Sequence, residues 1–452
     1  MLSAYISDSE ADLRAASEQA VELALRAGGS QASAGASSSG GLQLGLRDGR
    51  LETAVRSGHR SLNLTVFKDG RAGSASTTTF DAEAIKRLVQ EAVSIMQWAQ
   101  PDADNGLADA IDLAHDVPHP LRYEPASDDA AAMAEEASGM ERALHAVEMP
   151  AGTELRTSEV GLNCSEALSV MVTSSGFCRA NLASTQARWC SALAARDGAM
   201  ARDYAQSMTR RRSDLRPAAW LAERALRGAA GQLGARTVPS GTGPVLFSPR
   251  TAQALIEDLV GALMGAAQYR RASFLAGALG DLVAADHIDL IEDPFEPWGL
   301  ASGAYDAEGV AGRRRLVLDA GVVGGYFLNS LNARRLGMRT TGNASGPYNL
   351  TLSSRRPGGD GLAMQRQLGT GLLVTAITGG RTDPATGHWS RAVEGYWIED
   401  GVPAFPVAGI TLSGDMRTML RGITHVGDDV ERFGAFRTGS ILIDAMHIGG
   451  RA

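Results

Sequence analysis

Cysteines and long apolar runs are scarce in this sequence, and both shortages narrow the class of protein. Only Cys164, Cys178 and Cys190 occur among 452 residues, and no C-x-x-C pair is present. A disulfide framework or a cysteine-based metal site is therefore not expected. No apolar run reaches the roughly 18 residues that span a bilayer, and the first residues lack the basic and apolar regions of a signal peptide. We expect a cytoplasmic protein that does not act at a membrane.

An excess of basic charge is also lacking. The chain has 43 Lys and Arg against 51 Asp and Glu, a formal net charge of -8. The basic run at 210–212 is short. Proteins that bind nucleic acid usually carry a basic patch or stripe, so nucleic acid is not an expected partner.

Common catalytic and phosphate-binding motifs are missing as well. There is no G-x-S-x-G elbow, and the glycine-rich segment 319–325 lacks the G-K-[ST] ending of a phosphate loop. His115 and His119 are four residues apart, but Pro118 between them prevents the continuous helix that would align both rings. A metal site at these two histidines is not expected.

Glycine, in contrast, is abundant, and the 53 glycines favour many turns and much β-structure. In the first hundred residues, apolar spacing predicts helices over 10–27 and 81–99. The small, polar segment 30–41 is interpreted as a mobile loop. Four short strands are predicted between 42 and 78. They are separated by three turn signals, Asp48-Gly49, Gly58-His59 and Asp69-Gly70.

This order of elements predicts an α+β protein with two domains. The first, 1–235, would hold an antiparallel sheet with packed helices. The acidic, proline-bearing segment 101–120 reads as a connector, so a further boundary is placed near 101–125. The second domain, 236–452, is expected to be mostly antiparallel β, barrel-like or sandwich-like, with a few helices.

One predicted helix organises the second half. A buried strand at 245–247 leads into it, with Ser248 as a cap and Pro249 at the first helical position. Its apolar residues recur at helical spacing, and this places Glu257 and Asp258 away from the buried face. Adjacent outward acids on a core helix occupy a place where a metallopeptidase carries its ligands, yet this helix contains no histidine.

A second candidate is the glycine-rich loop 337–350, which precedes a predicted strand. Small residues there would let another chain approach and pair through main-chain hydrogen bonds. A purely structural loop explains the composition equally well, and both interpretations stay open.

The motifs of the second half resemble the TldD/PmbA family of modulator-of-gyrase proteases, and its TldE (PmbA) branch in particular. The resemblance covers residues 238–450 and is weaker over the first half. It is carried by TTGNASGPYNLTL at 340–352, GLLVT at 371–375, DPATG at 383–387, EGYWIEDG at 394–401, PVAGITLSG at 406–414 and MLRGITHVGDD at 419–429.

The resemblance implies a two-subunit peptidase. In that family the TldD-type subunit holds zinc through H-E-x-x-x-H on a helix and a later cysteine, and the Glu acts as general base. The three positions fall here on Glu257, Asp258 and Ala262, and no cysteine follows Cys190. We expect no cofactor in this chain, zinc in a TldD-type partner, and a non-catalytic role in proteolysis of unfolded peptides and removal of leader segments.

Within this interpretation the two subunits enclose a chamber for the peptide, and this chain helps to bind the substrate and to close that chamber. Gly342, Asn343 and Gly346 are the candidate substrate-binding residues, because the glycine-rich loop matches the family and lacks bulk. Heterodimer formation with the TldD-type subunit is expected, with a homodimer possible when the chain is alone. Two alternatives remain open, an active metallopeptidase with a divergent site at Glu257 and Asp258, and a homodimeric peptide-binding protein.

Overall fold

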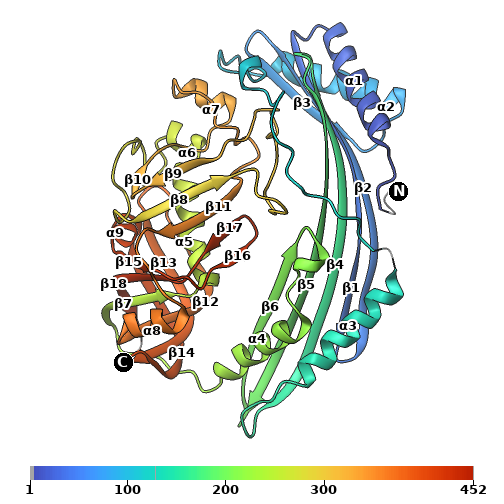
Figure 1. The fold of residues 1–452 in the computed structure, drawn as a ribbon. Helices are drawn as coiled ribbons and strands as arrows, with labels where there is room; N and C mark the ends of the chain where they lie inside the picture. The colour runs from blue at the N-terminus through green and yellow to red at the C-terminus, as the bar shows by residue number, and fades with distance from the viewer. Residues whose placement is uncertain (1–4, 128, 451–452) are drawn as a thin grey trace.

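A six-stranded antiparallel sheet dominates the first half of the chain. The computed structural model describes residues 5–127 and 129–450. The strands of this sheet lie in the order β3-β2-β1-β4-β5-β6, and Figure 1 shows them curving along most of the molecule's height. Their bounds are β1 Gln31–Arg47, β2 Arg50–Lys68, β3 Arg71–Thr77, β4 Glu154–Thr173, β5 Cys178–Arg196 and β6 Ala199–Thr209.

Two pairs of helices cover one face of this sheet. The even-numbered residues of β1 point to that face, and their side chains are buried. Ala32, Ala34 and Ala36 share a hydrophobic core with α1 (Glu10–Arg26) and α2 (Ala82–Trp98). The leucines further along β1, at 42, 44 and 46, share a second core with α3 and α4. These two helices span Ala130–His145 and Ala218–Gly231.

Two predictions for this half are wrong. Residues 30–41 are not a mobile loop, because β1 runs through them. The predicted turn at Gly58-His59 is absent too, since β2 continues through both residues and Gly58 pairs with Gly40. A Cβ at Gly40 would lie 2.5 Å from the carbonyl oxygen of Tyr5, so Gly40 allows a close backbone approach within a continuous strand.

The other turn signals and both early helices are confirmed. Asp48-Gly49 and Asp69-Gly70 connect antiparallel strands with positive φ at all four residues, as two-residue hairpins require. Residues 1–4, part of the segment in which no signal peptide is expected, lie outside the described residues, as does Asp128.

The second half contains a closed barrel of five strands. The strands follow the order β7-β12-β13-β14-β18, and β18 pairs with both β7 and β14, which closes the ring. Their bounds are β7 Gly241–Phe247, β12 Gly371–Thr382, β13 His388–Glu399, β14 Val402–Asp415 and β18 Ile441–Gly449, with β15 (Ile423–Val426) added beside β18. The predicted α+β class, with a barrel-like second half, is confirmed.

A third sheet lies against the barrel through a shared core. Its order is β10-β9-β8-β11-β17-β16, with bounds β8 Ile288–Asp293, β9 Arg315–Asp319, β10 Val322–Val323, β11 Asn349–Ser354, β16 Glu431–Phe433 and β17 Phe436–Thr438. Helix α5 (Pro249–Leu263) contributes its apolar face to this core. The remaining helices are α6 Gly265–Tyr269, α7 Ser330–Arg335, α8 Gly361–Leu368 and α9 Met416–Arg421.

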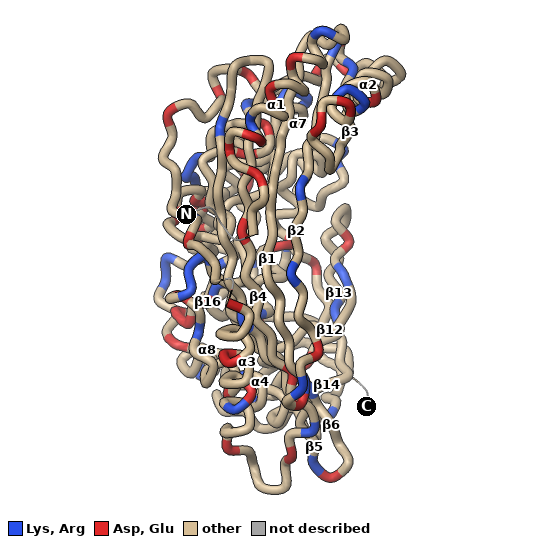
Figure 2. Tube along the Cα trace, turned by 90° about the vertical axis from the view of Figure 1, so that its right-hand side faces the viewer, with Lys and Arg blue, Asp and Glu red and all other residues tan. Residues whose placement is uncertain are grey.

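The two halves lie side by side, with the long first sheet next to the barrel and third sheet (Figure 1). The chain crosses from α4 to β7 through residues 232–240, and the domain boundary predicted there stays a prediction. Acidic and basic residues are interspersed along the described trace (Figure 2). Among the described helices none is both long and apolar enough to cross a membrane.

Candidate functional site

Helix α5 is held at its start by Thr251 rather than by the predicted cap. Ser248 occupies the N-cap position, but its side chain accepts no hydrogen bond from a helix amide. The Thr251 hydroxyl instead donates to the carbonyl oxygen of Val374 on β12, at 3.0 Å. Pro249 stands at the first helical position, as predicted. The start of α5 is thereby fixed to the barrel.

Asp258, which the resemblance places at the general-base position, forms an ion pair. Its carboxylate accepts hydrogen bonds from Arg391 Nη2 at 3.0 and 3.2 Å, and from Trp389 Nε1 at 3.1 Å. The Thr382 hydroxyl donates a further bond at 2.7 Å. Both side chains of the pair are largely buried. A carboxylate with these four contacts is oriented towards the barrel strands and has little capacity to activate a water.

The other two motif positions, Glu257 and Ala262, do not supply the histidine ligands of the family's zinc motif. Glu257 is exposed and its carboxylate accepts a hydrogen bond from Gln253 Nε2, four residues earlier on the helix. Ala262 is buried, and its carbonyl oxygen accepts from Gln268 and Ser273. Zinc sites use three or four N, S or O donors in tetrahedral geometry. One free carboxylate, one ion-paired carboxylate and an alanine do not fit zinc, and no group of three His, Cys, Asp or Glu within the described residues could hold a metal ion.

The polar side of α5 faces a cleft between the two halves of the molecule. This cleft has a volume of about 1210 Å³. From the first half it is lined by residues 204–209 of β6 and by the segment that follows. From the second half it is lined by Gln253 and Glu257 of α5, by Arg391, and by Glu431–Phe433 of β16. Helix α5, on which the resemblance places the metal motif, thus forms part of the wall of this cleft.

Two strand edges are open to this cleft. Among the described strands, β6 is terminal in the first sheet and β16 is terminal in the third. Unpaired backbone N–H and C=O groups on a terminal strand can accept another strand through main-chain hydrogen bonds. Sequence reasoning placed such capture in the glycine-rich loop and missed these edges, because a strand's position within a sheet is a product of topology.

Several arginines in the cleft are neutralised by neighbouring acids. Arg224 pairs with Glu431, Arg432 with Glu296, and Arg250 with Asp203 at 2.9 Å. The Trp220 ring lies beneath the guanidinium groups of Arg216 and Arg224, which are 5.2 and 5.0 Å from its centre. The Arg224–Glu431 and Arg250–Asp203 pairs join the first half to the second across the cleft.

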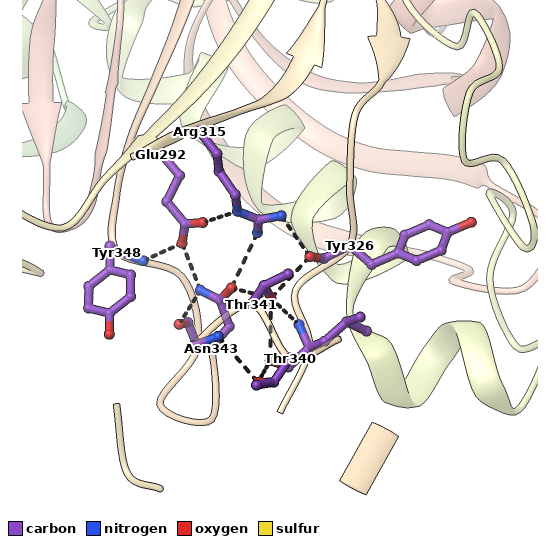
Figure 3. A network of polar contacts seen from close by, with 10 residues as sticks. Glu292, Arg315, Tyr326, Thr340, Thr341, Asn343 and Tyr348 are labelled. Carbon is purple, nitrogen blue, oxygen red and sulfur yellow. Dashed lines mark hydrogen bonds and ion pairs between the residues drawn. The ribbon is translucent and has the colours of Figure 1, made fainter. Parts of the chain in front are cut away.

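The glycine-rich loop is built around a buried carboxylate (Figure 3). Glu292 of β8 is 1% exposed and pairs with Arg315 of β9 at 2.7 Å. It also accepts hydrogen bonds from Asn343 Nδ2 at 2.7 Å and from the backbone N–H of Tyr348 at 2.9 Å. Asn343 Oδ1 in turn accepts from Arg315 and from the Thr341 hydroxyl. The loop is therefore fixed to the third sheet by a polar network.

The three candidate substrate-binding residues lie within this loop. Asn343 is buried, and both ends of its side chain bond inside the network. Gly342 and Gly346 have φ of 72° and 89°, where a side chain would be strained. A Cβ at Gly342 would also meet the Ala311 carbonyl oxygen at 2.6 Å, whereas Gly346 has open space. None of the three is among the cleft-lining residues, and their contact with substrate stays a prediction.

A second buried acid, Asp306, holds the loop from another side. Its carboxylate accepts backbone hydrogen bonds from Ala344 at 2.8 Å, Glu308 at 2.9 Å and Val310 at 3.0 Å. Burial raises the pKa of this carboxyl to about 6, although the three backbone donors act in the opposite direction. The folded protein therefore holds this proton more tightly than the unfolded chain does.

This raised pKa predicts a pH dependence of stability. Between about pH 4 and pH 6, the Asp306 carboxyl is ionised in the unfolded chain but still protonated in the folded protein. The free energy of unfolding therefore falls as pH rises through this range, by up to about 3 kcal/mol. Urea unfolding of the wild type and of Asp306→Asn measures this effect. From about pH 4 to about pH 6, the unfolding free energy of the wild type should fall by that amount relative to that of Asp306→Asn, which cannot ionise. A shift in the opposite direction would show that the backbone donors dominate and that the pKa is lowered.

Two family models match the chain. One is described as the PmbA/TldA metallopeptidase C-terminal domain and covers residues 240–450, and the other, PmbA/TldA metallopeptidase domain 1, covers 32–96. The Escherichia coli O157:H7 protein "Metalloprotease PmbA" is 33% identical over 441 residues, which are 96% of each chain.

Solved structures share the same fold. A candidate modulator of DNA gyrase from Bacteroides thetaiotaomicron superposes with a TM-score of 0.88 at 23% identity, covering 97% of this chain and 98% of that one. TldE from Thermococcus kodakarensis superposes with a TM-score of 0.79 at 17% identity, covering 96% and 100%. The two matched domains and the 33% identity to the Escherichia coli protein over nearly the full length of both chains show that this chain belongs to the PmbA/TldD metallopeptidase family.

Proposed function

We propose that this chain is the non-catalytic, substrate-binding subunit of a two-subunit, cytoplasmic peptidase whose zinc is carried by a TldD-type partner. The observation that carries the proposal is the state of α5 in the cleft wall. Asp258 is tied to Arg391 and Trp389, and Ala262 replaces a ligand. The scaffold of the family's metal site persists here without a donor set that suits zinc.

The cleft supports a role in binding extended peptides. A peptide that lies between the two walls would add as a strand to the free edge of β6 or of β16. Main-chain pairing recognises backbone groups and therefore tolerates many sequences, which suits unfolded chains and leader segments as substrates. Closure of a chamber with the partner would then admit extended chains and exclude folded proteins.

The alternative of an independently active metallopeptidase has less support. A divergent site would have to use Glu257 and Asp258, and only Glu257 is free of an ion pair. Oxygen donors of this kind suit hard cations such as Mg²⁺ or Ca²⁺, which usually take six or more ligands. Two adjacent carboxylates supply too few of them.

Co-expression with a TldD-type subunit tests the proposal. Cleavage of an unfolded peptide, such as reduced and alkylated casein, should occur with the pair and not with this chain alone. Mass measured by light scattering should show a heterodimer in preference to a homodimer. Variants in the TldD-type subunit's motif should abolish the activity of the pair, whereas Glu257→Gln in this chain should leave it unchanged. Cleavage by the isolated chain, or no heterodimer, would overturn the proposal.

A further inference from the structure

Two arginines beside the cleft have no acidic partner, unlike the paired arginines of its walls. Arg122 lies in the connector after α2, and Arg210 directly follows β6. Within the described part of the chain, neither guanidinium forms a salt bridge with a carboxylate. Arg122 Nη1 donates to Asn181 Oδ1 at 2.6 Å, while Arg210 Nη1 donates to the carbonyl oxygen of Ser184 at 2.9 Å.

Several polar atoms around this pair are buried and unsatisfied. They are the Nε atoms of Arg122 and Arg210 and the hydroxyl oxygen of Tyr348, none of which has a hydrogen-bond partner. Arg122 and Tyr348 flank Gly303, since a Cβ built there would lie 3.7 Å from Arg122 Nη1 and 3.4 Å from the Tyr348 ring. Buried polar groups are nearly always paired, so these three atoms have hydrogen-bonding capacity left for an acceptor.

Burial also makes these charges costly. Desolvation, together with the neighbouring charge of Arg122, lowers the pKa of Arg210 to about 10. Desolvation likewise lowers the pKa of Arg122, and the neutral phenols of Tyr305 and Tyr348 lie near it. Two partly buried cations that repel each other would be stabilised by an anion placed between them.

Arg210 follows a strand edge that is open to the cleft, although Arg122, Arg210 and Tyr348 are not themselves among the residues that line it. Thr209 and Arg211, on either side of Arg210, line the cleft, and so does Leu300, whose carbonyl oxygen accepts from Arg210 Nη2. A peptide that pairs in parallel with β6 would have its carboxyl end near Arg210, the residue that directly follows β6. An antiparallel peptide would place its cationic amino end there.

We propose that Arg122 and Arg210, with the Tyr348 hydroxyl, form an anion subsite that takes a carboxylate of a peptide bound in the cleft. Guanidinium groups bind carboxylates through charge-assisted hydrogen bonds, and a phenol adds a neutral donor. The carboxylate comes from the C-terminus of the peptide or from an acidic side chain. This inference rests on the proposed function, because it assigns a subsite of the peptide cleft.

Binding of three defined peptides tests the subsite. The probes are fluorescein-labelled Ala/Thr/Val octapeptides with a free C-terminal carboxylate, with a C-terminal amide, and with an amide plus one Glu near the C-terminus. Fluorescence anisotropy with the full-length chain should give a Kd for a carboxylate-bearing peptide about tenfold lower than for the plain amide. Preference for the free acid identifies the C-terminus as the ligand, and preference for the Glu peptide identifies an acidic side chain.

Arg122→Gln should remove this preference, while binding of the plain amide stays the same. Tyr348→Phe removes only a hydroxyl without a partner, so it should keep the fold and reduce the preference. Arg87→Gln, at an exposed arginine of α2, is the charge-matched control and should change nothing. Equal Kd values for all three peptides, or a preference that survives in Arg122→Gln, would overturn the subsite alone. Failure of every peptide to bind, with and without the TldD-type subunit, would overturn the proposed function and this inference with it.

Discussion

Arg315→Met is expected to lower the free energy of unfolding by about 3–5 kcal/mol, because it leaves a buried carboxylate without its counter-charge. Arg315 donates to Glu292 through Nε at 2.7 Å, to the Tyr326 carbonyl oxygen at 2.9 Å, and to Asn343 at 3.2 Å. Methionine keeps most of the apolar stem and removes all three bonds. Urea unfolding, followed by circular dichroism, measures the change.

Two further variants separate charge burial from general damage. Glu292→Gln in the Arg315→Met background removes the unpaired charge and should restore part of the lost stability, which a double-mutant cycle would report as coupling. Arg14→Met is the matched control, because its ion pair with Glu10 is exposed on α1, and no measurable change is expected. A loss for Arg315→Met as small as for the control would contradict the account of the glycine-rich loop as a network fixed by Glu292.

Trp389→Ala is expected to cost about 3–5 kcal/mol of unfolding free energy. The side chain is 0% exposed, and its ring meets that of Phe247 edge-to-face, with centroids 5.9 Å apart. Its removal would leave a cavity in the core beneath α5 and take one hydrogen bond from Asp258. Denaturant unfolding of the purified variant gives the size of the loss.

The chain offers a matched control at Trp98. This tryptophan is 86% exposed at the end of α2, so Trp98→Ala should change stability by less than about 0.5 kcal/mol. Trp389→Phe keeps most of the buried area and loses the donor to Asp258, so it should fall between the two alanine variants. Equal losses for Trp389→Ala and Trp98→Ala would refute the packing described for α5.

Local signals in the sequence predicted local structure well. Helix α5 begins at Pro249 and turns Glu257 outward as its apolar spacing required, whereas Asp258, also expected away from the buried face, is largely buried in its pair with Arg391. The Asp-Gly hairpins are also where the sequence placed them. In these cases neighbouring residues determine the conformation, so a short window of sequence is sufficient.

Long-range packing was beyond such reasoning. Residues 30–41 are rich in Ala, Ser and Gly, which have low strand propensity, and they were interpreted as a loop. The structure uses them as a strand because small side chains such as Ala34 let α1 and α2 pack closely on the sheet. The Asp258–Arg391 pair is 133 residues apart in sequence, and no local pattern reveals it. Arg122 and Arg210 likewise come together only in the fold.

The proposed absence of metal chemistry leaves α5 with a structural role. Its apolar face still joins the barrel to the third sheet, and its polar face still lines the cleft. Arg391 now neutralises the acid at the general-base position, and Trp389 and Thr382 complete its hydrogen bonds. Under the proposed function, the partner therefore carries out catalysis and this chain binds the peptide.

Zinc content tests that claim most directly. The isolated full-length chain and its complex with a TldD-type subunit would be dialysed against zinc, passed through a desalting column, and analysed by inductively coupled plasma mass spectrometry. We predict no stoichiometric zinc in the isolated chain and one zinc per heterodimer. One zinc bound per isolated chain, and lost on Asp258→Ala, would contradict the account and restore α5 as a metal site.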